Sequence, residues 1–463
     1  MSEVATPGGA AAPRGLMTVL FAGVFLAALD TAVVAPVIPA LREAFALDHR
    51  AAGLVTTVFI LFALPATALM ANLGDRHGRR PVYLACILVF ALGSLVVALA
   101  PSYWGILLGR AIQGVGGGGI LPVASAVIGD ALPPARRGRA LGLVGATYGM
   151  AFVLGPPLAA LAMVLASWRW IFLANLPVAA AVLLLGLRAL PRRTTPAQPG
   201  PLDWPGVVVV FALLGALVLG LTQVADAWSG ALLWPALLLA ALGLVPLLAA
   251  IERRVAAPLV PPALLTRRQL VLAYLLALGA GIGMGAVMYL TSLAQLAHGV
   301  SEAHGGFALL PLVLCSMIGS MLSGRQLHRL GARTVTLAGF ALLALGYAAS
   351  AWTGWGLVGF LAATTPAGLG IGVVVGGALR GIAIDESPPA LRGAAQGLVN
   401  IATSIGTLLA VSGIGALADW AGGGAHGFGV AYAAVAGVMA AMWLLALGLA
   451  RHEPTRGAAV VLP

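Results

Sequence analysis

The sequence has 463 residues, of which 61% are hydrophobic and only 8% are charged, and its mean hydropathy is +1.03. This composition excludes a water-soluble fold, which needs a polar surface. The formal net charge of +11 does not indicate a nucleic-acid-binding protein, because the basic residues are scattered through short loops and form no stripe.

The apolar residues gather in runs of about 20, the length that a helix needs to cross the hydrocarbon core of a bilayer. The runs lack the two-residue alternation that is typical of a membrane β-barrel. We therefore predict an all-α membrane protein with fourteen transmembrane helices. The predicted spans, in chain order, are residues 16–38, 51–72, 81–100, 103–127, 139–164, 170–190, 205–224, 231–250, 270–292, 305–324, 334–352, 355–378, 392–418 and 428–450.

The placement of the arginines orients these spans. When the N-terminus is set on the cytoplasmic side, most of the 25 basic residues fall in segments on that side. The loops on the other side hold only Arg42, Arg50 and Arg169, and Arg110 lies within a span. This bias follows the positive-inside rule. It predicts an even number of spans, with both termini on the cytoplasmic side of a bacterial inner membrane.

Two loop motifs occur twice, half a chain apart. The charged loop at 73–80 (LGDRHGRR) recurs in part at 327–333 (LHRLGAR), and the segment at 130–138 (DALPPARRG) recurs at 385–393 (DESPPALRG). We interpret these copies as an internal repeat of two six-helix bundles with two extra helices inserted between them. The predicted domains are an N-terminal bundle at 1–195, the inserted helices at 196–262 and a C-terminal bundle at 263–463.

These motifs, in their order along the chain, resemble the major facilitator superfamily and, within it, the fourteen-span drug:proton antiporter branch. The segments that carry the resemblance are the charged loop at 73–80, residues 29–31 with Pro39 in span 1, 109–114 in span 4, 149–157 in span 5 and 168–175 at the start of span 6. The resemblance covers the whole chain. It implies a transporter that works by alternating access and is not an enzyme.

Asp30 is the only acidic residue well inside a predicted span, and Arg110 is the only basic residue at a similar depth. An unpaired aspartate at the centre of a membrane helix costs about 2.5–3.5 kcal/mol, so it needs a partner or a function. One interpretation is a static ion pair that holds the bundle together. The other is a protonatable carboxylate facing a cavity and tuned by Arg110. The resemblance favours the second and assigns proton coupling to both residues.

The charged loop at 73–80 has two interpretations as well. It is either a topology anchor on the cytoplasmic side or a conformational switch, and only the switch explains its acid and its glycine. We expect Asp75 to lie at a helix N-terminus and an arginine of the loop to bridge to Asp130, which ends span 4 on the same side. His328 replaces Asp75 in the second copy, so that copy should hold more weakly. The switch residues implied by the resemblance are Asp75, Arg76, Gly78, Arg79, Arg80 and Asp130.

Span 5 carries the antiporter motif that the resemblance implies. Its residues are Gly149, Gly155, Pro156 and Pro157. The two prolines remove helix hydrogen bonds and predict a kink. The kink is interpreted either as a device against leakage near the outer gate or as an ordinary packing feature.

Candidates for a substrate cavity are polar, aromatic or methionine residues in the spans expected to line the centre. They are Gln113, Tyr148, Phe152, Met284, Met288, Tyr289 and Asn400. Each of them is also compatible with ordinary packing. An apolar pocket that contains methionine and aromatic side chains would suit bulky lipophilic molecules.

No cofactor or metal is predicted. The glycine runs at 116–119 and 368–372 follow no strand and lack the lysine of a phosphate-binding loop, and the histidines have no ligand spacing. Cys86 and Cys315 lie inside apolar runs and are expected to be buried thiols. Without a nucleotide site, transport must draw its energy from an ion gradient.

We therefore predict a proton-coupled antiporter that exports lipophilic drugs or natural products. Its expected partners are a small lipophilic substrate, protons and the lipid bilayer, with no nucleic acid, and the chain is expected to be a monomer. The alternatives are a dedicated exporter of a single metabolite, antibiotic or lipid and, less favoured, a proton-coupled uptake symporter. Because acids inside the spans are scarce, we expect neutral or monocationic substrates.

Overall fold

The computed structural model describes residues 15–47, 49–165, 167–191, 203–223, 233–255, 258–300, 307–352, 354 and 356–450. Within these ranges all regular structure is helical, and no strand occurs. Twelve helical stretches among the described residues are long and apolar enough to cross a membrane. The chain is therefore an all-α, multi-pass membrane protein, as its composition predicts.

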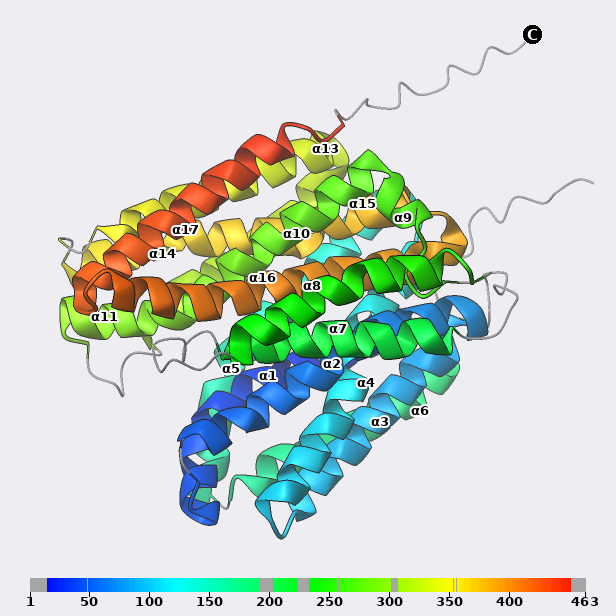
Figure 1. Ribbon diagram of the computed structural model, residues 1–463, viewed down its shortest axis with the longest axis horizontal. Helices are drawn as coiled ribbons and strands as arrows, with labels where there is room; N and C mark the ends of the chain where they lie inside the picture. Colours follow the sequence, from blue (N-terminus) through cyan, green and yellow to red (C-terminus); the bar gives the residue numbers. More distant parts are fainter. Residues whose placement is uncertain are drawn as a thin grey trace, which may run out of the picture.

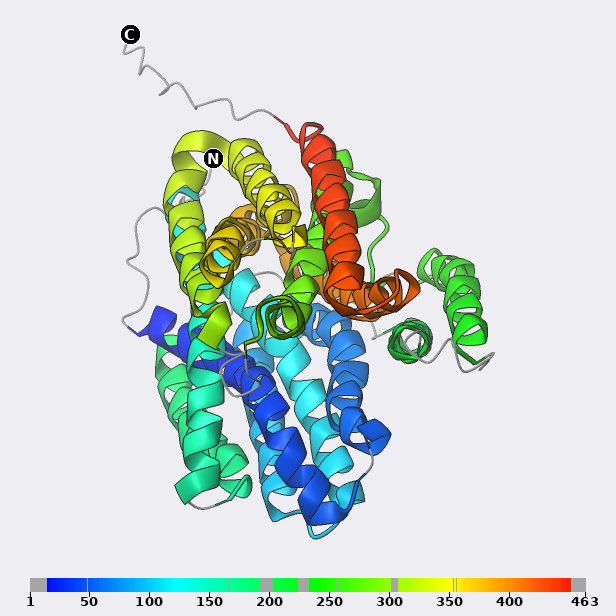
Figure 2. The same cartoon turned by 90° about the vertical axis from the view of Figure 1, so that its left-hand side faces the viewer.

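The first six long helices gather in one half of the molecule, coloured blue to teal in Figures 1 and 2. They are α1 (Leu16–Phe45), α2 (His49–His77), α3 (Arg79–Leu99), α4 (Tyr103–Ala131), α5 (Pro134–Leu165) and α6 (Arg169–Ala189). Their apolar side chains form two buried clusters, which include Tyr83, Phe90 and Phe172. The core of this half is thus built almost entirely from its own helices.

The last helices form the other half, coloured from yellow-green to red in Figure 2. They are α9 (Ala263–Thr266), α10 (Arg268–Ala286), η2 (Val287–Tyr289), α11 (Leu290–His298), η3 (Phe307–Leu309), α13 (Leu310–Ala351), α14 (Leu357–Val373), η4 (Val374–Ala378), α15 (Leu379–Asp385), η5 (Pro389–Leu391), α16 (Arg392–Trp420) and α17 (Gly424–Ala446). Their buried cluster includes Phe340, and the rings of Tyr347 and Tyr432 stack with centroids 5.9 Å apart. The two halves therefore have separate cores.

Two further helices, α7 (Trp204–Thr222) and α8 (Leu233–Glu252), lie side by side at one edge of the molecule, coloured green in Figure 2. Helix α7 packs against both α2 and α16, and its Val210 and Leu214 share a buried cluster with Leu64 and Leu408. Helix α8 packs against α7 and leaves most of its apolar side chains exposed. In a membrane protein such a face suits contact with lipid.

The repeated glycines Gly78 and Gly331 have the same unusual backbone conformation. Their φ angles are 97° and 77° and their ψ angles are 146° and 159°, respectively. A positive φ is costly for residues with a Cβ, so glycine is the natural choice at both places. At Gly331 this conformation interrupts α13, so that the spans predicted at 305–324 and 334–352 meet with only this non-helical residue between them.

The glycine run at 116–119 belongs to the packing of α4 and not to a nucleotide site. A Cβ atom at Gly116 would lie 2.6 Å from the carbonyl oxygen of Cys86 in α3. A Cβ atom at Gly119 would lie 2.5 Å from the sulfur of the same cysteine and 2.6 Å from the Cβ of Met70 in α2. Glycine therefore lets three helix backbones approach closely, as is common in membrane bundles.

Candidate functional site

A buried ion pair joins the middle of α1 to α4. The Nη1 atom of Arg110 donates a hydrogen bond to Oδ2 of Asp30 over 2.6 Å, and the two side chains are 1% and 0% exposed, respectively. The Nε atom of Arg110 donates to the backbone carbonyl of Val55 over 3.2 Å. The deep acid and the deep base that the sequence singles out are thus in direct contact. Their charges compensate each other in a region that water does not reach.

A shell of amide and hydroxyl groups completes the coordination of Asp30. Gln113 and Asn175 each donate from their side-chain nitrogen to Oδ1 of Asp30, over 3.0 and 3.3 Å. Both amides also donate to the hydroxyl oxygen of Ser94, over 2.7 and 3.1 Å. Gln113 in addition accepts from Arg110 over 2.9 Å. Both oxygens of the carboxylate are therefore occupied by donors from two other helices, α4 and α6.

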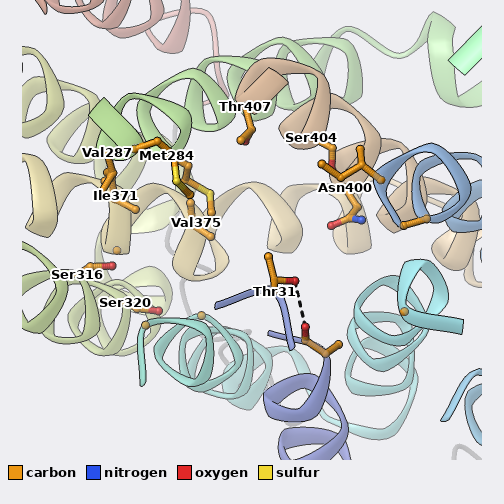
Figure 3. A pocket seen from close by; sticks show the side chains of 18 of the residues that line it. Thr31, Met284, Val287, Ser316, Ser320, Ile371, Val375, Asn400, Ser404 and Thr407 are labelled. Atoms are coloured by element: carbon orange, nitrogen blue, oxygen red, sulfur yellow. Dashed lines mark hydrogen bonds between the residues drawn. The ribbon is translucent and has the colours of Figure 1, made fainter. Parts of the chain in front are cut away.

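A central cavity of about 330 Å³ lies between the two halves. Helices α1, α2, α4 and α5 line it from one side, and α10, η2, α13, α14, η4 and α16 line it from the other. Figure 3 shows Thr31 facing this space from α1, with Met284 and Val375 across from it. Asn400, Ser404 and Thr407 follow one another along α16 and form a polar strip in a wall that is otherwise mostly apolar (Figure 3).

Phe59 contacts the ion pair and also lines the cavity. Its ring lies 4.3 Å from the guanidinium carbon of Arg110, within the range of a cation–π interaction, and the same residue lines the cavity. Thr31 lines the cavity too, and it follows Asp30 directly in α1. Asp30 itself is fully buried and is not among the described residues of the cavity wall. One ring and one helical step thus connect the ion pair to the cavity.

The structure divides the predicted cavity residues into three groups. Met284, Met288 and Asn400 line the cavity. Gln113 and Tyr289 are not among the described lining residues. Gln113 belongs to the shell around Asp30, and Tyr289 donates its hydroxyl hydrogen to the carbonyl of Val411 over 2.8 Å. Tyr148 and Phe152 fall on α5, but their side chains lie outside the described residues.

The antiporter motif of α5 is described in part. Gly149 lines the cavity, and a Cβ atom at Gly155 would lie 2.6 Å from the Cβ of Ala32 in α1. The motif therefore permits close packing of α5 against the helix that carries Asp30. Pro156 and Pro157 lie in the helical range of α5, but their side chains are outside the described residues, and the kink stays a prediction.

The charged segment at 73–80 was expected to be a loop, but only Gly78 lies outside the helices, between the end of α2 at His77 and the start of α3 at Arg79. This segment joins the two halves of the molecule. Asp75 accepts hydrogen bonds from the backbone nitrogens of Gly393 and Ala394, over 3.0 and 2.9 Å, at the first turn of α16. A carboxylate at this position interacts favourably with the helix dipole and with backbone N–H groups that have no partner inside the helix. The helix N-terminus expected for Asp75 thus belongs to the opposite half.

Arginine bridges surround this contact. The Nη2 atom of Arg79 lies 3.1 Å from Oδ1 of Asp75, and its Nε donates to Oδ2 of Asp130 over 2.5 Å. The other oxygen of Asp130 accepts from Arg392 over 3.1 Å. Asp130 therefore accepts hydrogen bonds from one arginine of each half.

The second repeated motif forms a reciprocal pair of bridges. Asp130 and Arg137 belong to its first copy, and Asp385 and Arg392 occupy the same places in its second copy. Arg392 bridges to Asp130, and Arg137 bridges to Asp385 over 3.0 Å. Each copy thus supplies an acid to the other copy's arginine. Asp75, Arg79, Asp130, Arg137, Asp385 and Arg392 together are called the bridge cluster below.

The remaining arginines of the charged loop contact other elements. Arg80 donates to the backbone carbonyl of Leu187 at the end of α6. Arg76 is buried and interacts electrostatically with Asp203, which caps the N-terminus of α7 through a hydrogen bond from the backbone nitrogen of Gly206 over 2.8 Å. The loop therefore contacts the inserted helices as well as the opposite half.

Several site residues carry no distinct signal in the sequence. Ser94 and Phe59 look like ordinary residues of apolar runs, and Asn175 falls in a recognised segment without a role of its own. Arg137 and Asp385 are visible as parts of a repeat, but a repeat does not tell which of its residues meet. A search for polar residues at the depth of Asp30 would have pointed to Ser94 and Asn175 but not to Phe59.

The chain is similar to known transporters in sequence and in fold. The model of the Major Facilitator Superfamily matches residues 20–410. The uncharacterized MFS-type transporter YfiU of Bacillus subtilis (strain 168) is 30% identical over 405 residues, which are 84% of this chain and 76% of the relative. The puromycin resistance protein pur8 of Streptomyces alboniger is 30% identical over 412 residues, which are 86% and 80% of the two chains.

The fold is also that of solved transporters. The structure of the proton:xylose symporter XylE bound to 6-bromo-6-deoxy-D-glucose is similar with a TM-score of 0.66 over 93% of this chain and 94% of that chain. The identity is 16%, so the likeness concerns the fold alone. The family match covers most of the chain, and both relatives align over more than three quarters of their length. The chain is a membrane transporter, not an enzyme, and belongs to the major facilitator superfamily.

Proposed function

We propose that the protein is a proton-coupled antiporter that exports lipophilic drugs or natural products by alternating access. The observation that carries this proposal is the position of Asp30, a buried carboxylate next to the cavity residue Thr31 and one aromatic ring away from the cavity. The name of the Streptomyces relative, a puromycin resistance protein, supports export of small organic molecules.

Proton binding at Asp30 would change the balance of charge around Arg110. In the deprotonated state the carboxylate compensates the buried guanidinium at 2.6 Å. Protonation removes that compensation and leaves a buried cation, which is strongly unfavourable unless the surroundings rearrange. The rearrangement would act on α1 and on Phe59, and both border the cavity. Proton binding and substrate binding are thereby linked through shared structural elements.

The bridge cluster would act as the switch between cavity orientations. It lies on the arginine-rich face, which the positive-inside rule places in the cytoplasm, and it links the two halves there through Asp75, Asp130 and Asp385. Closure on the cytoplasmic side corresponds to an outward-facing arrangement. Rocking of the halves would break these contacts and open the cavity to the cytoplasm.

The topology that we propose has fourteen spans. Twelve stretches meet the length and composition criteria for a span, and α13 counts once among them. Because α13 has 42 residues and is interrupted at Gly331, we count it as two spans. The 32-residue α5 adds one more span. The proposed units are the six-helix bundles at 1–195 and 263–463, with the helices at 196–262 between them. Both termini would face the cytoplasm of a bacterial cell, and the chain would work as a monomer.

Dye transport in proteoliposomes tests this proposal. A pH gradient should drive transport of the lipophilic dye Nile red by the wild-type protein, and the Asp30→Asn variant should lose this gradient-driven transport. The control is Asp419→Asn, which removes an exposed carboxylate at the end of α16 and should behave as wild type. Undiminished gradient-driven transport by Asp30→Asn would rule out Asp30 as the proton carrier.

A dedicated exporter of one antibiotic is the second candidate function. The observation that favours it is the name of the Streptomyces relative, which refers to resistance to a single antibiotic. Susceptibility of cells that express the protein, measured over a panel of unrelated lipophilic compounds, separates the two candidates. Protection against several unrelated compounds supports broad export, and protection against one compound alone supports dedicated export.

A further inference from the structure

We propose that the central cavity selects uncharged molecules with hydrogen-bond donors and rejects organic cations. This inference rests on the proposed export function and names the substrate class of the same cavity. Every described residue of the cavity wall is uncharged, and the wall combines apolar side chains with a few hydroxyl groups and the amide of Asn400. A cation entering this space would lose its hydration and find no opposite charge among these residues.

Asp30 does not supply the missing charge. It is the nearest carboxylate along the cavity helices, but it is fully buried, and Arg110 already neutralises it at 2.6 Å. The side-chain amides of Gln113 and Asn175 donate to its other oxygen. Phe59 contacts the guanidinium group and lines the cavity. A substrate in the cavity therefore faces an aromatic ring and not a free carboxylate.

The hydroxyl groups of the wall act mainly as acceptors. Thr31, Ser320 and Thr407 each donate their hydroxyl hydrogen to a backbone carbonyl, over 3.2, 2.6 and 3.1 Å. Asn400 donates one amide hydrogen to Thr67 over 3.5 Å. The lone pairs of these hydroxyl oxygens stay available for a ligand. The wall thus suits a lipophilic molecule that carries neutral O–H or N–H donors.

One added charge should reverse the selection. Ser404 lines the cavity on α16, one helical turn from Asn400. The variants Ser404→Asp and Ser404→Asn have nearly the same size and shape and differ mainly in charge. Transport of two dyes into proteoliposomes is then compared under the same pH gradient. N-Phenyl-1-naphthylamine, which is neutral and carries one N–H donor, is the uncharged probe, and ethidium is the cationic probe.

The wild-type protein should transport N-phenyl-1-naphthylamine at least about tenfold faster than ethidium, and Ser404→Asp should raise ethidium transport about tenfold over Ser404→Asn. Equal transport of both dyes by wild type would overturn the inference while leaving the export function intact. Transport of neither dye would contradict the export function itself and the inference with it. If Ser404→Asp fails to reach the membrane, the pair Ser316→Asp and Ser316→Asn makes the same comparison from α13. No gain of ethidium transport in a folded aspartate variant would also overturn the inference.

Discussion

Phe59 is the residue through which the ion pair and the cavity meet. Its ring contacts the guanidinium group of Arg110 with one part and borders the cavity with another. A cation–π contact in a desolvated site contributes about 2 kcal/mol. We propose that the ring helps to hold Arg110 in place when Asp30 is deprotonated and that a bulky substrate in the cavity displaces it. We regard Phe59 as a positioning residue for proton coupling.

Replacing this ring should weaken coupling more than substrate binding. We predict that Phe59→Leu keeps binding of Nile red within about threefold of wild type and reduces pH-driven transport by about tenfold or more, because it removes the cation–π contact. Binding is measured by dye fluorescence, and transport is measured over a range of pH values. The conservative variant Phe59→Tyr keeps the ring and should retain the wild-type pH profile. A Phe59→Leu variant with an unchanged pH profile would show that the ring has no part in coupling.

At the scale of elements, the bridge cluster combines repeat symmetry with unequal burial. The two reciprocal bridges have nearly the same length, 3.1 Å for Arg392 with Asp130 and 3.0 Å for Arg137 with Asp385. The side chain of Asp130 is only 10% exposed and meets two arginines, whereas that of Asp385 is 63% exposed and meets one. Exposed ion pairs contribute little. The closed state should thus depend mainly on the bridges of α4.

Neutralising the two acids should therefore have unequal effects. We predict that Asp130→Asn destabilises the closed cytoplasmic face by about 2 kcal/mol, because two arginines lose a largely buried partner. The matched variant Asp385→Asn should change the stability of the closed cytoplasmic face by less than about 1 kcal/mol. Spin labels are placed at His77 and Pro388 in a background without Cys86 and Cys315. The distances between them, measured by electron paramagnetic resonance, report the populations of the closed and the open cytoplasmic face. Equal shifts for both variants would contradict the unequal roles of the bridges.

The same elements show how far the sequence predicts the site. The depth of Asp30 and Arg110 along their spans permitted their contact but did not predict it. The charged segment suggested a helix N-terminus for Asp75 and an arginine bridge to Asp130. The identity of that helix, α16, was not predictable, because it depends on how the halves dock. Phe59 was missed for a physical reason: an aromatic residue in an apolar span looks the same whether it faces lipid, a helix or a cation.

At the scale of the whole molecule, the composition and the length of the apolar runs predict a polytopic helical protein, and the structure agrees. The repeat predicts two related six-helix bundles, and this stays a prediction. The structure shows separate buried clusters and the same backbone conformation at Gly78 and Gly331. The position of α7 against both α2 and α16 could not be predicted, because the sequence of a hydrophobic span does not show which helices it packs against. That position links the inserted helices to each half, and Arg76 adds an electrostatic contact with Asp203.

Two separate sets of charged residues carry the proposed mechanism. One set is the buried pair of Asp30 and Arg110 beside the cavity, and the other is the bridge cluster on the arginine-rich face. The first would respond to protons and the second to the relative position of the halves. In this account substrate and proton compete because both act on α1 and Phe59, while the bridge cluster sets which side the cavity faces.

The release of protons on substrate binding tests this competition most directly. Purified protein in weakly buffered detergent solution is mixed with Nile red, and a pH-sensitive dye records the protons that appear. The account predicts that wild type releases protons and that Asp30→Asn binds Nile red without releasing any. Proton release from Asp30→Asn equal to that of wild type would contradict the claim that Asp30 couples proton binding to transport.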